Sequence, residues 1–405
     1  MVPGEDRLNL SSLYGVRGLS YLLSLLMVPY LTRVLGPESF GILAYTQSFG
    51  NYLALGTELG LGLYGERLVA RTRANPQHLP SVAWTLTLAR LGFALLGLGV
   101  TFGVLLALRP THSDLLVIAA LNALTAQNFP SPIMIGLEKQ RFPAIVGLLH
   151  QGSLFLYAIA FMREPGDLKN FLSASLIFSF VFFVGGMIWL LRSFGKPSWN
   201  TFLFIHLLKN SFTVYAFQLA TGVYNSLGPF LLFHLKGAEA AALYAVSEKL
   251  VKASLGLWGP FFALIPPKLS YWYEIAPRRA LLLAQKYLRS ALFIGGALSL
   301  GLFTFAPFAP LLFGSAYLGT SSLIILLSPV PLLVAISNVL GLGLVFARGQ
   351  DSILLGATLT GASVFLGLGI PLMWGLGPHG ASLALTLAEG ATTLVLAKRA
   401  LGGAT

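Results

Sequence analysis

Long apolar runs, each separated from the next by a few polar or basic residues, follow one another along the whole chain. The first two runs, roughly residues 10–34 and 39–62, are divided by a break at Gly36-Pro37. About 20 apolar residues form a helix long enough to cross the roughly 30 Å hydrocarbon layer of a bilayer. Gly36 and Pro37 favour a helix end, and Glu38 suits the positive end of the following helix. The two runs therefore predict a transmembrane hairpin.

The same pattern predicts twelve transmembrane helices. Their ranges are 10–34, 39–62, 80–106, 114–135, 142–162, 170–191, 211–234, 240–264, 284–306, 321–346, 352–374 and 379–399. We expect an all-α polytopic membrane protein with two six-helix lobes, residues 1–197 and 198–405, joined by the basic segment 192–210. An even number of spans per lobe gives both lobes the same orientation, so a pseudo-two-fold axis along the membrane normal would relate them around a central cavity.

An internal repeat supports the two lobes. The segment that ends in Gly36-Pro37-Glu38 resembles the segment that ends in Gly237-Ala238-Glu239. The connection after the fourth span, residues 136–140, likewise resembles residues 346–350, with Glu138 aligned to Arg348. We therefore expect corresponding turns in the two halves of the chain.

Composition agrees with a membrane protein, since 56% of residues are hydrophobic, 10% are charged and the mean hydropathy is +0.78. Soluble proteins have about 25% charged residues. No cysteine is present, which excludes disulfides and thiolate metal sites. A net charge of +12 would suggest nucleic acid for a soluble protein, but here it indicates basic cytoplasmic loops. No nucleic-acid partner and no cleavable signal peptide are expected.

Basic residues outside the spans are distributed unevenly. Seventeen lie on the side of the N-terminus, and five lie on the opposite side, at Arg33, Arg109, Arg163, Lys169 and Lys236. Because cytoplasmic loops carry the excess of Lys and Arg, both termini are predicted to be cytoplasmic.

Polar residues of the first hairpin share one face of each helix, with Arg17, Ser20 and Ser24 in the first and Ser48, Asn51 and Glu58 in the second. A polar group in hydrocarbon costs several kcal/mol unless it is satisfied, so these faces contact protein or line an aqueous cavity. Interhelical hydrogen bonding is the alternative explanation for Ser and Asn. Arg17 lies near mid-membrane, where a charge indicates a functional site.

The first hairpin also resembles a known family. The core Arg-Val-Leu-Gly-x-x-x-Phe-Gly, Arg33 to Gly41, and the glycine-containing run near Arg67 to Arg71 are similar to Wzx-type O-antigen and polysaccharide repeat-unit flippases. These belong to the multidrug/oligosaccharidyl-lipid/polysaccharide exporter superfamily. The resemblance implies a transporter in the bacterial inner membrane that moves an undecaprenyl-pyrophosphate-linked oligosaccharide from the cytoplasmic to the periplasmic leaflet.

A cationic cavity would suit the pyrophosphate of such a substrate. The candidates predicted to line it are Arg17, Ser48, Asn51, Gln218, Asn225, Lys249 and Lys252, together with Arg90. Arg17 offers a planar fork of donors, whereas lysines act as point charges. For Lys252 the alternative is an ion pair with Glu248 four residues earlier. For Arg90 the alternative is an extended side chain that reaches the cytoplasmic headgroups.

Two carboxylates are candidates for binding a coupling ion, a proton or sodium. Glu389 belongs to the polar stripe Ser382, Thr386, Glu389 and Thr393, and Glu58 lies near the cytoplasmic boundary. Structural pairing is the alternative for Glu389, and an interfacial location is the alternative for Glu58. The histidines lack metal-ligand spacing, so no metal or cofactor is expected.

Two other functions are considered. A multidrug or organic-cation antiporter of the same superfamily predicts an acidic cavity, which Arg17 and Lys249 disfavour. An integral-membrane polysaccharide-processing enzyme predicts a large periplasmic loop or a His/Asp cluster, and neither occurs in the sequence. Besides the substrate, the expected partners are membrane lipids and other polysaccharide-assembly proteins, and a monomer is expected.

Overall fold

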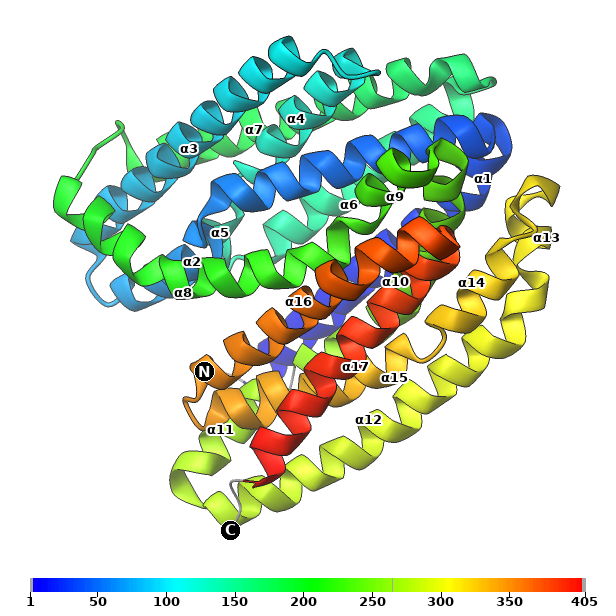
Figure 1. The fold of residues 1–405 in the computed structure, drawn as a ribbon. Helices are drawn as coiled ribbons and strands as arrows, with labels where there is room; N and C mark the ends of the chain where they lie inside the picture. The colour runs from blue at the N-terminus through cyan, green and yellow to red at the C-terminus, as the bar shows by residue number, and fades with distance from the viewer. Residues whose placement is uncertain (1–2, 264, 403–405) are drawn as a thin grey trace. The chain divides into compact units, whose positions relative to one another are not determined.

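The computed structural model describes residues 3–263 and 265–402 (Figure 1). Side chains are not described for residues 3–14, 17, 21, 257–261, 263, 266, 267, 270, 351, 401 and 402. Every regular element in the described ranges is a helix. As the apolar runs predict, the chain is a helical, multi-pass integral membrane protein.

The first compact unit comprises Met1–Met27 and Thr46–Leu219. Its helices include parts of α1 (Pro3–Glu58) and α8 (Thr201–Ser226). The others are α2 (Leu61–Thr72), α3 (Leu79–Leu108), α4 (Ser113–Gln127), α5 (Ser131–Gly136), α6 (Arg141–Phe161) and α7 (Leu168–Phe194), with 3₁₀ turns at Pro76–His78 and Pro165–Asp167. Leu61, Leu86 and Ile133 lie in its core.

The second compact unit comprises Val28–Tyr45 and Ala220–Thr405. Its helices are α9 (Gly228–Lys236), α10 (Ala238–Ala263), α11 (Ile265–Ile275), α12 (Pro277–Phe305), α13 (Ala309–Phe313), α14 (Thr320–Leu327), α15 (Val330–Ser337), α16 (Asp351–Leu376) and α17 (Pro378–Gly402), with the rest of α1 and α8. A π-helix, η5, covers Asn338–Val345, and 3₁₀ turns cover Ala306–Phe308 and Ser315–Tyr317. Residues 28–45 thus group with the second unit, and residues 198–219 group with the first.

Eight helical stretches of the described chain are long and apolar enough to cross a membrane. One of them, Gly18–Glu58, contains both predicted spans of the first hairpin, with a non-helical residue at Gly36. The other seven stretches match predicted spans three, five, six and nine to twelve. The remaining predicted spans correspond to α4, α8 and α10. Of these, α4 has only 15 residues, and α10 carries three charges within residues 248–252.

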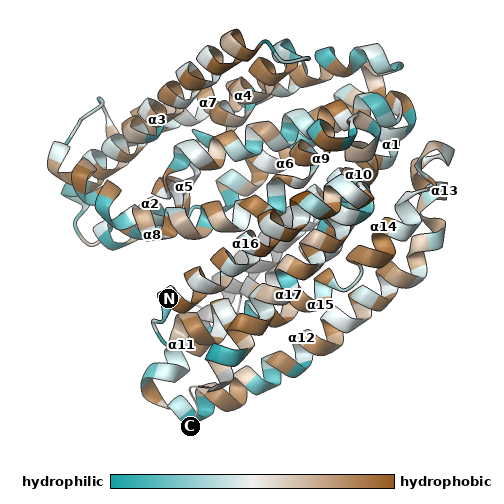
Figure 2. Cartoon of the chain, viewed as in Figure 1, coloured by the Kyte–Doolittle hydropathy of each residue, from teal (hydrophilic) through white to brown (hydrophobic). Residues whose placement is uncertain are grey.

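Large apolar side chains on the outer helix faces are exposed, as expected for contact with lipid rather than water. Leu95, Leu96 and Phe293 are examples. In Figure 2 apolar residues cover most of α3, and polar residues gather in the segments at its ends. This distribution suits a helix that spans the hydrocarbon layer and is bounded by its two interfaces.

Two predicted boundaries were wrong. The link 192–210 is only a short segment, because α8 begins at Thr201, where Asn200 Oδ1 accepts a hydrogen bond from the Leu203 N–H (3.0 Å). The predicted span 114–135 is interrupted before Pro130, since proline lacks an N–H to continue the helix.

Helix ends after the fourth and tenth predicted spans have the same geometry. Glu138 and Gly349 have φ of 63° and 68°. The hydrogen bonds also correspond: Glu138 N–H to Ile135 O and Lys139 N–H to Met134 O match Gly349 N–H to Phe346 O and Gln350 N–H to Val345 O. Both are Schellman caps. The repeat is therefore present, but Glu138 corresponds to Gly349, one residue away from the predicted pairing with Arg348.

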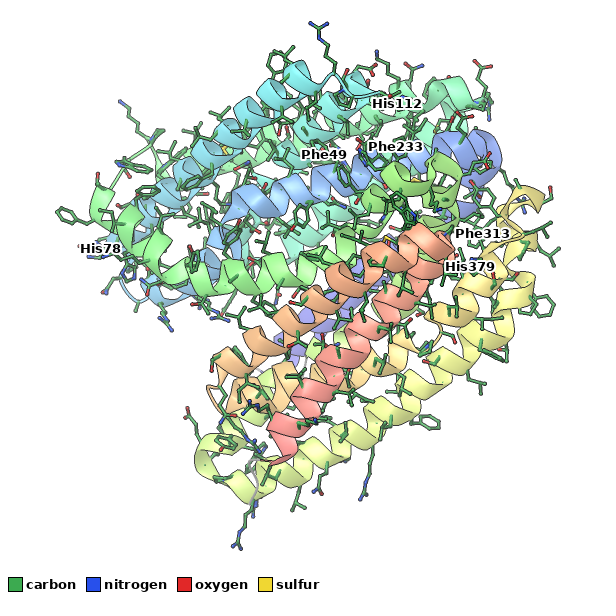
Figure 3. The ribbon with its side chains drawn as sticks, in the orientation of Figure 1. Phe49, His78, His112, Phe233, Phe313 and His379 are labelled. Atoms are coloured by element: carbon green, nitrogen blue, oxygen red, sulfur yellow. The ribbon has the colours of Figure 1, made fainter. Side chains whose placement is uncertain are left out.

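Residues 28–45 pack on α9 and α10 within the second unit. The Tyr45 ring stacks on Phe233, with centroids 4.1 Å apart and planes 11° apart. Phe233 is labelled in Figure 3. Gly41 lies directly against the carbonyl of Ala238, so that a Cβ at position 41 would clash with this backbone. The predicted hairpin turn is thus held by an aromatic stack and a close backbone approach.

Candidate functional site

A group of charged residues lies on α10. The Lys252 ammonium is 3.0 Å from Glu248 Oε1 and donates to the carbonyl of Asn225 on α8 (2.6 Å). Glu248 is buried, and Tyr244 OH donates to its carboxylate over 3.5 Å. The ion pair considered for Lys252 is therefore formed, and a separate hydrogen bond joins Lys252 to the backbone of Asn225.

Lys249 is half-buried on the same turn of α10. It is attracted by Glu248 and repelled by Lys252. Residues 248–252 therefore carry two positive charges and one negative charge, which leaves a net positive charge on this turn of the helix. Such a charge, in a helix predicted to cross the membrane, can bind an anion.

The remaining polar candidates have different environments. In the first unit Ser48 is buried and Asn51 is exposed, so the predicted stripe on α1 is not uniform. Gln218 on α8 has a buried Oε1 that has no hydrogen-bond partner among the described residues. Arg17 lies within α1, but its side chain is outside the described residues. Convergence of these residues with Lys249 on one axis stays a prediction.

Arg90 on α3 does not extend to the lipid headgroups. Its side chain is only 5% exposed, and its guanidinium donates to the carbonyls of Gln127 and Phe129 (3.4 Å to the latter). These carbonyls end α4, where a helix has unpaired acceptors and partial negative charge. Arg90 therefore caps the break between α4 and α5, which differs from the alternative of a side chain that reaches the headgroups. The role predicted for Arg90 in substrate binding stays a prediction.

Glu58 forms a charged cluster with Arg90 and Glu66. Both carboxylates attract the Arg90 guanidinium, and they repel each other. Burial raises the pKa of Glu66 above its usual value, and the charge of Glu58 raises it further, whereas Arg90 and Arg67 oppose the shift. Glu58 is therefore one member of an electrostatic cluster formed by α1, α2 and α3, rather than an isolated interfacial carboxylate. Sequence reasoning missed Glu66, because the break at Leu59-Gly60 that redirects α2 leaves no local pattern.

The polar stripe on α17 contacts α14 and α15. Thr386 donates to the Leu326 carbonyl (2.8 Å), and Thr393 lies 2.7 Å from the Ser337 hydroxyl. These hydroxyls therefore form the interhelical bonds that were considered as the alternative explanation for polar stripes. Glu389, the carboxylate of this stripe, has a different environment from these hydroxyls.

Glu389 lies between these hydroxyls on α17 and is only 6% exposed. Within the described residues its carboxylate forms no ion pair, and it interacts electrostatically with Tyr224 on α8. Tyr224 also hydrogen-bonds the side chains of Thr221 and Thr392. The predicted coupling residue is thus a buried carboxylate beside a phenol, and Tyr224 is a neighbour that the sequence did not identify, because it is remote in the chain.

No group of three or more His, Cys, Asp or Glu side chains in the described part of the chain could hold a metal ion. His78 and His112 lie at opposite ends of α3 (Figure 3). His379, at the start of α17, contacts the hydroxyl of Ser322 (2.8 Å).

The chain was compared with known proteins. It is 24% identical over 348 residues to a protein of Escherichia coli (strain K12) named "Putative O-antigen transporter", covering 83% of this chain and 82% of that protein. A protein of Shigella dysenteriae with the same name is 24% identical over 404 residues, covering 96% and 98%. At 24% identity these names are properties of the two relatives and are not transferred to this chain.

Two solved structures share the fold. A multidrug resistance MATE transporter of the MOP superfamily, in an inward-facing conformation, gives a TM-score of 0.72 at 15% identity, over 97% of this chain and 94% of that one. A lipid II flippase in an inward closed conformation gives 0.72 at 16% identity, over 96% and 87%. The chain thus shares its fold with these two proteins, in agreement with the fold that the resemblance of the first hairpin implied.

A family model described as "Polysaccharide biosynthesis protein" matches residues 8–270, well over half of the chain. The match includes the first hairpin, on which the resemblance was recognised, and the charged turn of α10. The chain belongs to this polysaccharide biosynthesis protein family.

Proposed function

We propose that this protein is a flippase, not an enzyme, which moves an undecaprenyl-pyrophosphate-linked oligosaccharide of the O-antigen repeat-unit type from the cytoplasmic to the periplasmic leaflet. The observation that carries the proposal is the net positive turn of α10, with Lys249 half-buried beside the Glu248–Lys252 pair. Family membership and the names of the relatives support a lipid-linked saccharide. An anionic pyrophosphate is the part of such a substrate that intramembrane cations would recognise.

In this mechanism Arg17 and Lys249 bind the pyrophosphate in a central cavity, while Lys252 remains paired and contributes less. Ser48, Asn51, Gln218 and Asn225 would offer hydrogen bonds to the sugar, and the buried, unsatisfied Oε1 of Gln218 is an acceptor available for this. Two lobes related by an axis along the membrane normal would alternate access to the two leaflets. A proton or sodium gradient, bound through Glu389 or Glu58, would drive the cycle without a cofactor.

The proposed location is the bacterial inner membrane, with both termini in the cytoplasm. A reporter that is active only in the periplasm, fused after Thr405, should remain inactive. The same reporter fused within residues 109–112 should be active, because this segment follows the third predicted span. Activity at the C-terminal fusion would contradict the proposed topology.

Translocation of a fluorescent undecaprenyl-pyrophosphate oligosaccharide in proteoliposomes tests the function. The wild-type protein should move it. Lys249→Gln should slow the movement strongly, and Lys249→Glu should slow it more, because repulsion replaces attraction. Arg17→Lys should retain more activity than Arg17→Ala, since charge returns without the planar fork of donors. Lys286→Gln, at an exposed lysine of α12, is the matched control.

Two outcomes would contradict the mechanism. Wild-type rates for both Arg17→Ala and Lys249→Ala would show that these charges do not bind substrate. Loss of insertion or of the folded state in both variants would assign the charges to structural pairing. Melting temperature and membrane yield of each variant distinguish these outcomes from a true defect in transport.

The alternative function is export of organic cations, and the shared fold with a multidrug MATE transporter is the observation that favours it. A cation exporter needs an acidic site, and Glu389 is a buried carboxylate that could provide one. Efflux of cationic dyes from cells distinguishes the functions. Dye efflux that is lost in Glu389→Gln but retained in Lys249→Gln would favour the alternative.

A further inference from the structure

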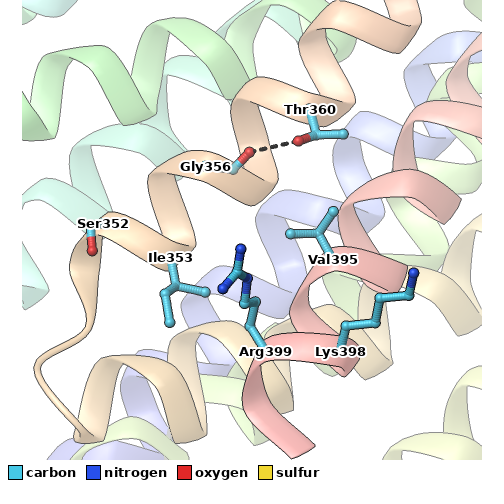
Figure 4. Close-up of a pocket in the computed structure, with 7 residues that line it drawn as sticks. All are labelled: Ser352, Ile353, Gly356, Thr360, Val395, Lys398 and Arg399. Atoms are coloured by element: carbon cyan, nitrogen blue, oxygen red, sulfur yellow. Dashed lines mark hydrogen bonds between the residues drawn. The ribbon is translucent and has the colours of Figure 1, made fainter. Parts of the chain in front are cut away.

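A pocket of about 480 Å³ lies on the second unit where α16 begins and α17 ends. It is lined by Ser352, Ile353, Gly356 and Thr360 of α16 and by Val395, Lys398 and Arg399 of α17 (Figure 4). The two helices run side by side, in orange and red in Figure 1. The pocket is separate from the charged turn of α10, whose residues do not line it.

The pocket combines cationic, hydroxyl and apolar groups. Lys398 and Arg399 are exposed, and within the described residues neither forms an ion pair or a side-chain hydrogen bond. Ser352 adds a hydroxyl, and the Thr360 hydroxyl donates to the Gly356 carbonyl (2.8 Å). Asp351 precedes Ser352, but its side chain is outside the described residues. The described polar groups therefore favour an anion that keeps contact with water.

The apolar part of the pocket continues toward the middle of the spans. Ile353 and Val395 line the pocket, and Leu359 and Leu394, which adjoin the lining residues Thr360 and Val395, are exposed. Leu394 is 65% exposed and lies about one helical turn deeper than Lys398. Both helices are candidate membrane spans, over Ser352–Leu376 and Pro378–Ala400. Lys398 and Arg399 therefore lie at the end of a span, where a phosphate headgroup lies in a bilayer, and the leucines lie at the depth of its acyl chains.

We propose that this pocket binds an anionic phospholipid of the surrounding bilayer. Its phosphate lies between Lys398 and Arg399, and its acyl chain follows Ile353, Val395 and Leu394. Charge complementarity selects an anionic headgroup, and the apolar continuation selects a lipid over free phosphate. Since the predicted topology puts these residues on the cytoplasmic side, the site takes a lipid of the inner leaflet. This lipid is a bound partner and not the transported substrate.

Native mass spectrometry of the purified full chain measures this binding. The probes are phosphatidylglycerol, phosphatidylcholine with the same acyl chains, and inorganic phosphate. Phosphatidylglycerol should bind most tightly. Each of Lys398→Gln and Arg399→Gln should weaken its binding about fivefold, and the double variant about 25-fold, because a basic residue near a membrane surface contributes about 1 kcal/mol. The double variant Lys286→Gln/Arg289→Gln is the control, since it removes two exposed cations of α12.

A second test fills the pocket without a change in charge. No atom lies within 4 Å of a Cβ added at Gly356, so Gly356→Leu can place its side chain in the pocket without a clash. It should reduce phosphatidylglycerol binding at least tenfold. Gly367→Leu, at an equally open site of α16, should not.

Several results would overturn the proposal. Equal binding of the two phospholipids, or wild-type binding by both the double variant and Gly356→Leu, would exclude a specific site. Displacement of phosphatidylglycerol by equimolar inorganic phosphate would show that the pocket recognises an anion alone. Binding of undecaprenyl pyrophosphate with exclusion of phosphatidylglycerol would assign the pocket to the substrate. If the double variant does not fold, Gly356→Leu decides between these outcomes.

Discussion

Gly36 and Gly237 adopt the same backbone conformation, although they lie in different halves of the chain. Gly36 has φ 67° and ψ 176°, and Gly237 has φ 87° and ψ −179°. This region of positive φ with extended ψ is accessible almost only to glycine. The sequence repeat aligns the turns that contain these two residues. The two halves of the chain therefore share the same strained backbone conformation at this turn.

Replacement of either glycine by alanine should destabilise the protein by about 1–3 kcal/mol, because a Cβ is disfavoured in this conformation. At both positions no atom lies within 4 Å of the added Cβ, so backbone strain alone is tested. Thermal unfolding in detergent measures the effect. Gly99→Ala, at an open helical position of α3, is the control and should be neutral or stabilising. Wild-type stability of both Gly36→Ala and Gly237→Ala would contradict the strained conformation.

Removal of Arg90 should affect folding more than transport. Arg90→Ala removes a donor from the carbonyls of Gln127 and Phe129, of which Phe129 keeps the Ser131 N–H, and a hydrogen bond to a charged group contributes about 1.5–3 kcal/mol. We expect a lower melting temperature, with nearly normal transport per folded molecule. The control Arg71→Ala, at an exposed arginine of α2, should change neither the melting temperature nor the transport per folded molecule. Normal stability combined with lost transport would instead identify Arg90 as a substrate ligand.

The Glu248–Lys252 pair should act as a structural unit, unlike Lys249. Lys252→Met removes the ion-pair partner of the buried Glu248 carboxylate and should lower the free energy of unfolding by about 1–2 kcal/mol. This is less than the about 3–5 kcal/mol of a fully buried pair, because Lys252 is 42% exposed. Adding Glu248→Gln should restore most of the lost stability. A double-mutant cycle measured by thermal unfolding checks this coupling, and strictly additive losses would exclude it.

Glu389→Gln should uncouple transport from the ion gradient while the protein remains folded. The amide has nearly the same shape but cannot take up a proton at the carboxylate beside Tyr224. Translocation should then proceed at the same rate with and without an imposed proton or sodium gradient. Thr386→Val, which removes a hydroxyl of the same stripe, should keep the gradient dependence. If Glu389→Gln also keeps it, Glu389 has a structural role.

The stability of the cluster at the end of α1 should depend on pH. Because the pKa of Glu66 is raised above its ordinary 4.5, the folded state favours the protonated form. Glu66 therefore destabilises the protein increasingly as pH rises through its folded pKa. Glu66→Gln should raise the melting temperature at pH 8 and leave it nearly unchanged at pH 4.

Glu138→Gln provides a comparison of opposite sign. The hydrogen bond from Arg73 lowers the pKa of Glu138, so the Glu138 carboxylate contributes stability above its ordinary pKa and loses it at acidic pH. Glu138→Gln should slightly lower the melting temperature at pH 8. A higher melting temperature of Glu66→Gln at pH 4, or the same pH dependence of the melting temperature in both variants, would contradict the electrostatic assignment.

The apolar runs were sufficient to predict an all-helical membrane protein, because every span must satisfy its own backbone hydrogen bonds. They could not predict that Arg90, which lies 37 residues earlier in the chain, donates to the carbonyl of Gln127 at the end of α4, because tertiary packing creates this contact. The pairing of Glu248 with Lys252 was visible as an i, i+4 spacing. The approach of Tyr224 to Glu389 was not visible, because it is created by tertiary packing between distant segments.

The π-helix Asn338–Val345 determines the direction in which the following residues point. A π-helix accommodates an additional residue per turn, and each additional residue rotates the downstream chain by about 100° about the helix axis. In the observed register Arg348 Nη1 donates to the carbonyl of Ala400, 2.9 Å away. A change of this segment to α-helix would swing Arg348 around the helix and break that bond. The hydrogen bond from Arg348 to Ala400 therefore stabilises the register that the π-helix sets.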